Sequence, residues 1–514
     1  MNLSEFFDHW AIVDNPFRGE EARHDAVFAK MSTPPNADDG LITAYHSDFD
    51  KILGEVERPS TSVLFGEKGS GKTAIRMQIA DRVRKHNKDR KTGRVFLVEY
   101  DDLNAQLDHL HERSGNKDPR QTLESIRLVD HIDAMLSLSV TRITNSLVGG
   151  TGRTDKSLGP SRDLQRAAKA MPKTLRREML LLQCVFDRDE HAHDRTRSLA
   201  RRLRLTAPSS VWLWRGLSIG GVVLPASVVG LYYTFGQGQS KELWLYGLFA
   251  AIGVWALMIL KRLVWDRIMS KGLARRVLKQ TRMLDRADAS LARSLDFVPP
   301  MQRNAATLPI NKSDEQRYAM LERLRRVLNK LGFSGMLVVI DRVDEPTLIS
   351  GDADRMRAVI WPMFNNKFLQ QDGLGIKMLL PIELRHALFK ESNAFFQEAR
   401  LDKQNLVERL AWTGAMLYDM CDTRLKACRK TGTEPISLLD LFDEDVSRQD
   451  IVDALDQMHQ PRDAFKFLYR CLTEHCSNVT REQESWRIPR LVLDQMRKME
   501  SERVQQLYRG IRPA

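Results

Sequence analysis

Short apolar runs recur along this chain, each bordered by polar and turn-forming residues. The runs at 62–65, 94–100, 335–341 and 375–381 have the length and composition of strands that are buried on both faces of a parallel sheet. Helical periodicity over 73–84, directly after the first run, gives the chain a β-α-β beginning. The pattern therefore predicts an α/β fold with a parallel sheet.

Most of the remaining chain has the periodicity of helices. We expect helices at 44–56, over 103–145 and over 352–369. Residues 162–205 and 262–330 are charged and amphipathic, and we expect them to pair as a stalk. From residue 401 onward the pattern is helical, with helices predicted at 405–421, 438–442, 451–459 and 462–476.

Two longer apolar runs stand apart from this pattern. Residues 216–235 and 243–260 contain no charged side chain, and a short polar link separates them. Because a bilayer core about 30 Å thick needs about 20 helical residues to cross it, each run is long enough for a transmembrane helix. Tryptophan and tyrosine gather near the run ends, as they do at membrane interfaces. The alternative is a helical hairpin buried in a soluble core, although core helices seldom stay apolar on every side for this length.

Basic residues flank the two apolar runs on their outer sides, whereas the link carries only Lys241 and Glu242. The positive-inside rule therefore predicts two spans in the inner membrane with both termini cytoplasmic. The same flanks explain the formal charge of +12, because 161–215 holds thirteen basic against six acidic residues and 261–288 holds nine against three. Such an excess suits the lipid bilayer as a partner. It does not support a nucleic-acid partner.

Cysteine content and the N-terminus agree with a cytoplasmic location. The five cysteines are odd in number and form no C-x-x-C pair, which is typical of reduced thiols. Acidic residues at Glu5, Asp8 and Asp14 interrupt the apolar residues near the N-terminus. We therefore expect no signal peptide, and membrane entry through the internal hairpin.

The sequence GEKGSGKT at 66–73 follows the first apolar run and matches the phosphate-binding pattern G-x-x-x-x-G-K-[ST] at every fixed position. The residues expected to bind nucleotide here are Gly66, Glu67, Lys68, Gly69, Ser70, Gly71, Lys72 and Thr73. Glycines allow a tight turn whose N–H groups point at phosphate oxygens, and the N-terminus of the following helix favours the same anion. Lys72 is expected to reach the β- and γ-phosphates in a catalytic role, and the Thr73 hydroxyl to bind Mg²⁺. ATP, with Mg²⁺, is the nucleotide that we expect here rather than GTP.

The apolar run at 335–341 ends in Asp341, and Asp344 and Glu345 follow closely. This is the Walker B pattern, in which the aspartate positions Mg²⁺. Asp344 and Glu345 are candidates for the catalytic base that deprotonates the attacking water. The alternative is that these two residues form a capping cluster ahead of the next helix.

Further positions are candidates for sensor and finger roles. The strand at 375–381 ends in apolar residues where some ATPases carry a polar sensor, and Glu383 and Arg385 lie just beyond it, so the sensor stays unassigned. Arg462 opens a predicted helix, and it either reaches the γ-phosphate from a lid or is an ordinary solvated or ion-paired side chain. Arg400 is a candidate finger for a neighbouring subunit.

These features together resemble the KAP family of P-loop NTPases, in which membrane helices interrupt the NTPase domain between Walker A and Walker B. IDRVDE at 340–345 is also similar to the acidic signature of NACHT and related signal-transduction (STAND) ATPases, and QPRDAFKFL at 460–468 resembles the lid of origin-recognition (ORC-like) AAA+ ATPases. The KAP signature usually has two adjacent aspartates where this chain has Asp341 and Arg342. The likeness covers roughly 45–105 and 330–480. It implies the strand order 5-1-4-3-2, with the Walker B strand two strands from the P-loop strand.

The resemblance and the patterns together predict a P-loop NTPase sheet interrupted by a helical insertion. The expected segments are an N-terminal arm (1–44), a first NTPase half (45–150), a stalk (151–210), a transmembrane hairpin (211–262), a second stalk (263–330), a second NTPase half (331–400) and a helical lid (401–514). The favoured function is a membrane-anchored ATPase switch, which the resemblance associates with signalling or defence. The alternative is a membrane scaffold that holds nucleotide with little hydrolysis and recruits an unknown protein partner. A transporter is disfavoured because the spans contain no charge, and a homo-oligomer is compatible with either function.

Overall fold

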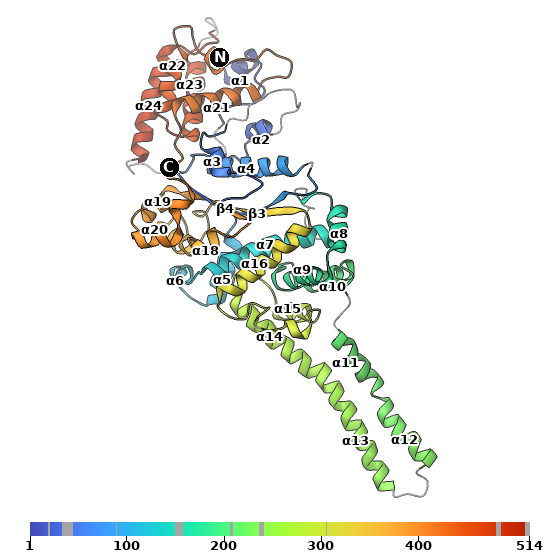
Figure 1. The fold of residues 1–514 in the computed structure, drawn as a ribbon. Helices are drawn as coiled ribbons and strands as arrows, with labels where there is room; N and C mark the ends of the chain where they lie inside the picture. The colour runs from blue at the N-terminus through green and yellow to red at the C-terminus, as the bar shows by residue number, and fades with distance from the viewer. Residues whose placement is uncertain are drawn as a thin grey trace.

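The computed structural model describes residues 1–18, 21–32, 45–88, 90–149, 158–205, 209–235, 241–304, 306–479 and 485–508. Figure 1 shows three parts in line: a helical domain, an α/β body, and a helical hairpin that projects from the body on the side away from the helical domain. Most of the predicted link at 148–160 and the start of the predicted helix at 44–56 lie outside the described residues.

The body is built on one five-stranded sheet in the order β2-β3-β4-β1-β5, with every paired strand parallel to its neighbour. The strands are β1 (Ser62–Gly66), β2 (Arg94–Tyr100), β3 (Phe333–Ile340), β4 (Leu374–Pro381) and β5 (Asn405–Val407). The α/β class and the parallel sheet are confirmed, and the strand order is the one that the resemblance implies. β4 lies between β1 and β3, so the strands that precede the two candidate motifs are not adjacent.

β5 corrects the predicted helix at 405–421. Asn405–Val407 pairs with β1, and α21 (Gly414–Ala427) begins only after it. A strand of three residues is too short to show a period of two in the sequence, and it forms here because the edge of β1 offers backbone partners. The sheet therefore extends past the predicted boundary at residue 400.

Alternate strand residues enter two cores on opposite faces of the sheet. On one face Leu64, Leu97 and Val339 pack against α3 (Phe49–Leu53) and α4 (Lys72–Asn87). The other face belongs to a larger core with α5 (Asn104–Ser114), α6 (Pro119–Glu124), α7 (Leu128–Val148), α17 (Ala353–Ile360), α18 (Asn366–Leu369), α19 (Ile382–Leu388) and α20 (Asn393–Ala399). The helix predicted at 352–369 is interrupted by a 3₁₀ turn at Trp361–Met363, where Pro362 cannot continue it.

Residues 162–205 and 262–330 do not form the predicted stalk. They fold into α8 (Ser161–Ala170), α9 (Lys173–Phe186), α10 (Ala192–Arg202), α14 (Asp266–Gln280), α15 (Asp288–Leu295) and α16 (Asp314–Lys330), which join the larger core. Leu182, Leu199 and Leu291 are fully buried there. Burying such a side chain contributes about 1.5–3 kcal/mol, and a two-helix stalk in water would leave many of these side chains exposed.

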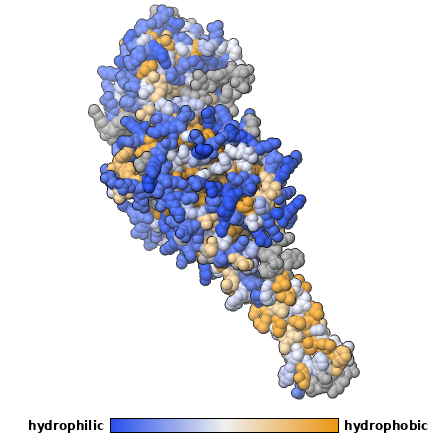
Figure 2. Space-filling model, viewed as in Figure 1, coloured by the Kyte–Doolittle hydropathy of each residue, from blue (hydrophilic) through white to orange (hydrophobic). Residues whose placement is uncertain are grey.

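The two apolar runs form the projecting hairpin. The elements are α11 (Ser209–Gly220), α12 (Val223–Phe235) and α13 (Lys241–Leu260), and a π-helical turn at Lys261–Trp265 joins α13 to α14. Both helical segments are long and apolar enough to span a membrane, and only 11% and 0% of their most apolar windows are buried. The alternative of a hairpin buried in a soluble core is therefore wrong for the described chain. Figure 2 shows the apolar surface that the hairpin exposes below the hydrophilic body.

The helical domain at the other end contains both ends of the described chain. α21, α22 (Arg448–Asp456), α23 (Pro461–Asn478) and α24 (Arg490–Tyr508) share one core with α1 (Leu3–His9) and α2 (Ala26–Ser32). The helix predicted at 438–442 is a 3₁₀ turn, Leu438–Leu441. The described part of the predicted N-terminal arm thus belongs to this domain, which we call the lid domain.

Candidate functional site

The loop between β1 and α4 makes a tight turn around the N-terminus of α4. Gly69 and Gly71 have φ angles of 99° and 96°, which side chains with a Cβ adopt only with strain. Gly71 caps α4, so Lys72 and Thr73 stand in the first helical turn. The free N–H groups of that turn make it a favourable place for an anion.

The Lys72 side chain folds back over this loop. Its Nζ donates to the carbonyl oxygens of Gly66 at 2.6 Å and Glu67 at 3.0 Å. Burial lowers the pKa of Lys72, and the carboxylates of Asp344 and Asp341 act in the opposite direction. The lysine is thus held at the loop that is predicted to bind phosphate.

Thr73 and Asp341 meet although 268 positions separate them. The Thr73 hydroxyl donates to Asp341 Oδ2 at 3.1 Å. The contact forms because α4 follows β1 and Asp341 follows β3, and parallel strands present their carboxyl ends at the same edge of the sheet. Burial raises the pKa of Asp341, and the neighbouring Arg76 guanidinium is the strongest influence that lowers it.

Arg76 is a site residue that sequence reasoning missed. Its Nε lies 3.4 Å from Asp341 Oδ2, and its Nη1 contacts Asp101, the residue after β2. Arg76 is one helical turn from Thr73 on α4, so helical spacing already placed both on the same face of the helix. Without the fold, nothing in the sequence indicated that this face meets Asp341.

Asp344 and Glu345 both line the cleft described below, and within the part of the chain that the structure describes only Glu345 has an ion pair. The Glu345 carboxylate contacts the Arg342 guanidinium, which also lies 3.4 Å from Glu21. Arg342 has a φ of 60°, a conformation that is uncommon for a residue with a side chain. The capping alternative for the two acids is wrong, because Asp352 caps α17 by accepting from the Arg355 N–H.

The candidate residues surround one cleft of about 620 Å³ between the body and the lid domain. Those that line it are Glu67, Lys68, Gly69, Gly71, Lys72, Thr73, Asp341, Asp344, Glu345 and Arg462. Gly66 and Ser70 do not line the cleft and instead support the loop from within: the Ser70 hydroxyl donates to Glu67 O at 2.8 Å, and a Cβ on Gly66 would come within 2.5 Å of that hydroxyl.

Arg462, at the start of α23, reaches the loop from the lid domain. A methyl group on Gly69 would come within 3.0–3.2 Å of the Arg462 side chain. The arginine therefore lies directly against the turn of the loop, although its role toward a nucleotide stays a prediction.

The segment that joins β5 to the lid domain also touches the loop. Trp412 Nε1 donates to Ser70 O at 2.8 Å, and Arg409 pairs with Glu67 at 2.8 Å. His46 Nε2 donates to Ala411 O at 2.8 Å and its ring packs against the Trp412 ring. These contacts connect the lid domain to the loop. Sequence reasoning assigned this segment to the lid but did not predict that it touches the loop.

The N-terminal segment lines the lid side of the cleft with Glu21, Asp25, Phe28 and Met31. Asp25 pairs with the buried Arg424 of α21 at 2.7 Å. The same stretch contacts the body, where Arg23 pairs with Asp101. Part of the predicted arm, within residues 21–31, is therefore in the cleft wall.

The other predicted positions lie outside the cleft. Glu383 is close enough to Lys72 to oppose the lowering of the lysine pKa, and Arg385 pairs with Glu408 at 2.9 Å. Arg400 ends α20 with a φ of 51° and is not a cleft residue. Its predicted finger role would need a second subunit and stays a prediction.

The arrangement fits a metal-bound nucleoside triphosphate. Mg²⁺ prefers oxygen ligands, and the Thr73 hydroxyl and the Asp341 carboxylate place two oxygens 3.1 Å apart beside the loop. Comparisons of the chain with protein-family models, with curated proteins and with solved structures gave no match. Any inference about the function of this chain therefore rests on the geometry of the cleft.

Proposed function

We propose that this chain is a membrane-anchored P-loop ATPase that binds and hydrolyses ATP with Mg²⁺ and acts as a conformational switch. The observation that carries the proposal is the hydrogen bond between Thr73 and Asp341, which joins two motifs from distant parts of the sequence beside one cleft. The cleft volume of about 620 Å³ lies within the range of small-molecule sites. The placement of β4 between the two motif strands is a second, independent support.

The roles of the chain's residues follow from their positions. Lys72 and the N–H groups around Gly69 and Gly71 would hold the phosphates, with the lysine exchanging its carbonyl partners for phosphate oxygens. Thr73 and Asp341 would hold Mg²⁺, and the bound ion would neutralise negative charge on the phosphates. Asp344 or Glu345 would accept the proton of the attacking water.

The lid domain would be the moving part of the switch. Arg462 already lies against Gly69. Its positive charge would attract the negatively charged phosphates of a nucleotide bound in the loop. Nucleotide binding would thus draw the lid domain toward the body, and loss of the terminal phosphate would weaken that attraction.

The hairpin would anchor the protein in the membrane. Its apolar side chains are exposed, among them Phe235, Leu243 and Tyr246 at 70–76%. An apolar surface of this kind is rare on a soluble monomer. The basic residues beside the hairpin favour the orientation with body and lid domain in the cytoplasm.

A nucleotide-binding scaffold with little hydrolysis is the second candidate. The observation that favours it is the ion pair between Arg342 and Glu345, which engages one of the two candidate bases. In this case the cleft would still bind ATP, and the bound state would recruit a protein partner.

Phosphate release by detergent-solubilised protein separates the two functions. We expect Lys72→Ala to abolish ATP binding, and Asp344→Asn or Glu345→Gln to keep binding but slow turnover by about 10²–10⁴-fold, the usual contribution of a general base. Glu322→Gln, an exposed acid of α16 outside the cleft, is the matched control and should behave as wild type. Wild-type protein that binds ATP but releases phosphate no faster than the acid variants would favour the scaffold and exclude the ATPase.

A further inference from the structure

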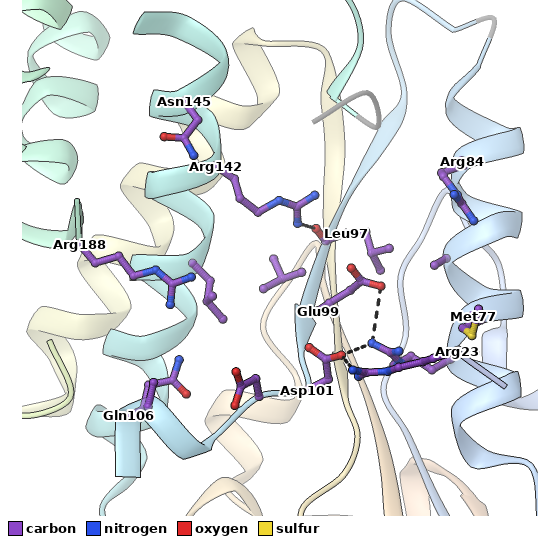
Figure 3. A pocket seen from close by; sticks show the side chains of 16 residues that line it. Arg23, Met77, Arg84, Leu97, Glu99, Asp101, Gln106, Arg142, Asn145 and Arg188 are labelled. Carbon is purple, nitrogen blue, oxygen red and sulfur yellow. Dashed lines mark hydrogen bonds and ion pairs between the residues drawn. The ribbon is translucent and has the colours of Figure 1, made fainter. Parts of the chain in front are cut away.

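A second and larger cavity, of about 1180 Å³, lies along the outer edge of β2, which is an edge strand of the sheet that the described residues form (Figure 3). Its walls come from α4 and α7, and its lining shares no described residue with the cleft between the body and the lid domain. We call this cavity the β2 groove.

The β2 groove is not arranged to accept an added strand. An extra strand would need the outward N–H and C=O groups of β2. The Asn87 side chain already bonds both groups of Val95, at 2.9 and 2.8 Å, and Arg142 donates to the carbonyl of Leu97. These side chains take the positions of a partner strand, so a ligand in the groove must bind side chains.

Basic side chains outnumber acidic ones in the groove. Five arginines and three acids line it. Arg23 and Arg76 pair with Asp101, and Arg76 also lies 3.8 Å from Glu99, so this part is largely neutralised.

Three further arginines come from three separate elements: Arg84 from α4, Arg142 from α7, and Arg188 from the connection between α9 and α10. The Arg84 guanidinium lies 3.7 Å from the Asp81 carboxylate. The exposed Arg188 side chain forms no hydrogen bond or ion pair within the described ranges. Figure 3 shows Arg142 and Arg188 on the α7 side of β2 and Arg84 on the α4 side, with Leu97 between them.

An apolar surface completes the groove, with Met77, Ala80, Leu97, Ala105 and Leu138 in its lining. Ligand sites typically combine such a surface with a few charged groups that fix orientation. Guanidinium groups bind phosphate and carboxylate with paired hydrogen bonds. We propose that the β2 groove is a second ligand site, for a phosphorylated small molecule of about nucleotide size, held by Arg84, Arg142 and Arg188.

The groove is connected to the first cleft through Arg76. This residue lines the groove, and its Nε lies 3.4 Å from Asp341 Oδ2. An anion in the groove acts on the same guanidinium that pairs with Asp341. The binding site itself does not depend on the proposed ATPase function, whereas this regulatory consequence rests on it.

Calorimetric titration with inorganic tripolyphosphate tests the site. The parent is full-length, detergent-solubilised Lys72→Ala protein, in which the loop can no longer compete for the probe. Adding Arg84→Gln and Arg188→Gln should weaken binding by tenfold or more, since a hydrogen bond to a charged group is worth about 1.5–3 kcal/mol. Both side chains are exposed, so the fold should be kept, and an unchanged unfolding temperature checks this.

The matched control replaces Arg166 and Arg275, which are exposed at 85% and 72% and lie outside the groove, so the loss of charge is equal. We expect the control pair to leave the affinity within about twofold of the parent, because exposed charges are screened by salt. Equal weakening by both pairs, no binding to the parent, or tighter binding of a polyglutamate peptide than of tripolyphosphate would each overturn the proposal. None of these results depends on whether the chain hydrolyses ATP.

Discussion

Lys377 is a buried charge in the centre of the sheet, and its replacement gives a sharp test of the structure. It lies in β4 and pairs in register with Ser62 of β1 and Val339 of β3. The side chain is fully buried, and its Nζ has one hydrogen-bond partner, Ser60 Oγ at 3.5 Å, with no ion pair among the described residues. Burial lowers the pKa of Lys377 from 10.5 to about 7.

The magnitude follows from the difference between these two pKa values. In the unfolded chain the pKa keeps its ordinary value of 10.5, and each pH unit of difference is worth about 1.4 kcal/mol, giving about 5 kcal/mol in all. Below about pH 7 both states are protonated, and the cost of burying the charge is fully present. Between pH 7 and 10.5 only the unfolded state holds the proton, so the free energy of unfolding rises with pH.

Lys377→Met removes the charge and keeps an unbranched side chain in the core. We expect the variant to be more stable than wild type at pH 6.5, and this advantage to shrink by about 2.5 kcal/mol at pH 9. For a domain of this size that corresponds to about 5–10 °C in unfolding temperature. The measurement is thermal unfolding of detergent-solubilised protein, followed by circular dichroism at both pH values.

Lys390→Met provides the control, because Lys390 is exposed and its loss should change neither value. An equal gain from Lys377→Met at pH 6.5 and pH 9 would refute the reasoning, because the charge of Lys377 would then be the same at both.

Three further predictions concern the cleft and the hairpin. Arg76→Met should slow phosphate release by about 10–100-fold, most strongly at acidic pH, because Asp341 loses the cation that lowers its pKa; a pH profile beside Arg76→Lys, which should recover part of the rate, measures this. Arg462→Gln should raise the KM for ATP about tenfold with a stable fold, and an unchanged KM would exclude contact with the phosphates. A cysteine at position 237 should react with an impermeant maleimide from outside the cell, whereas one at position 166 should react only after the membrane is permeabilised. The five native cysteines are buried and should not react.

The strands that sequence predicted well are those that are buried on both faces. β1 to β4 are short runs of apolar residues, so their composition alone indicates that they are buried strands. Their observed ends lie within two residues of the prediction. The loop and Asp341 were found for a related reason, since each directly follows such a strand. Their meeting depends on strand order, and that came from the resemblance.

The errors share a different cause. Leu182 and Leu199 lie on helices whose charged faces suggested a stalk, and only the packing on α7 shows what their apolar faces cover. Phe6 in α1 packs with the C-terminal helices, and Arg76 meets Asp341 from another motif. Periodicity indicates that a residue has a buried face, but it does not indicate which distant segment covers that face.

Figure 1 places the lid domain and the hairpin at opposite ends of the body, so an effect of nucleotide on the hairpin must cross the body. The first turns of α7 provide contacts in both directions. His131 Nε2 donates to the carbonyl oxygen of Val359, so Nδ1 accepts from the Tyr100 hydroxyl at 3.1 Å. Tyr100 ends β2, and the next residue, Asp101, is the partner of Arg76. One residue earlier, Asp130 accepts from Arg282 at 2.5 Å, just beyond α14, the helix that continues the hairpin. These contacts form a continuous connection between Asp341 and the hairpin through α7, and any coupling of nucleotide binding to the hairpin along this connection would be reciprocal.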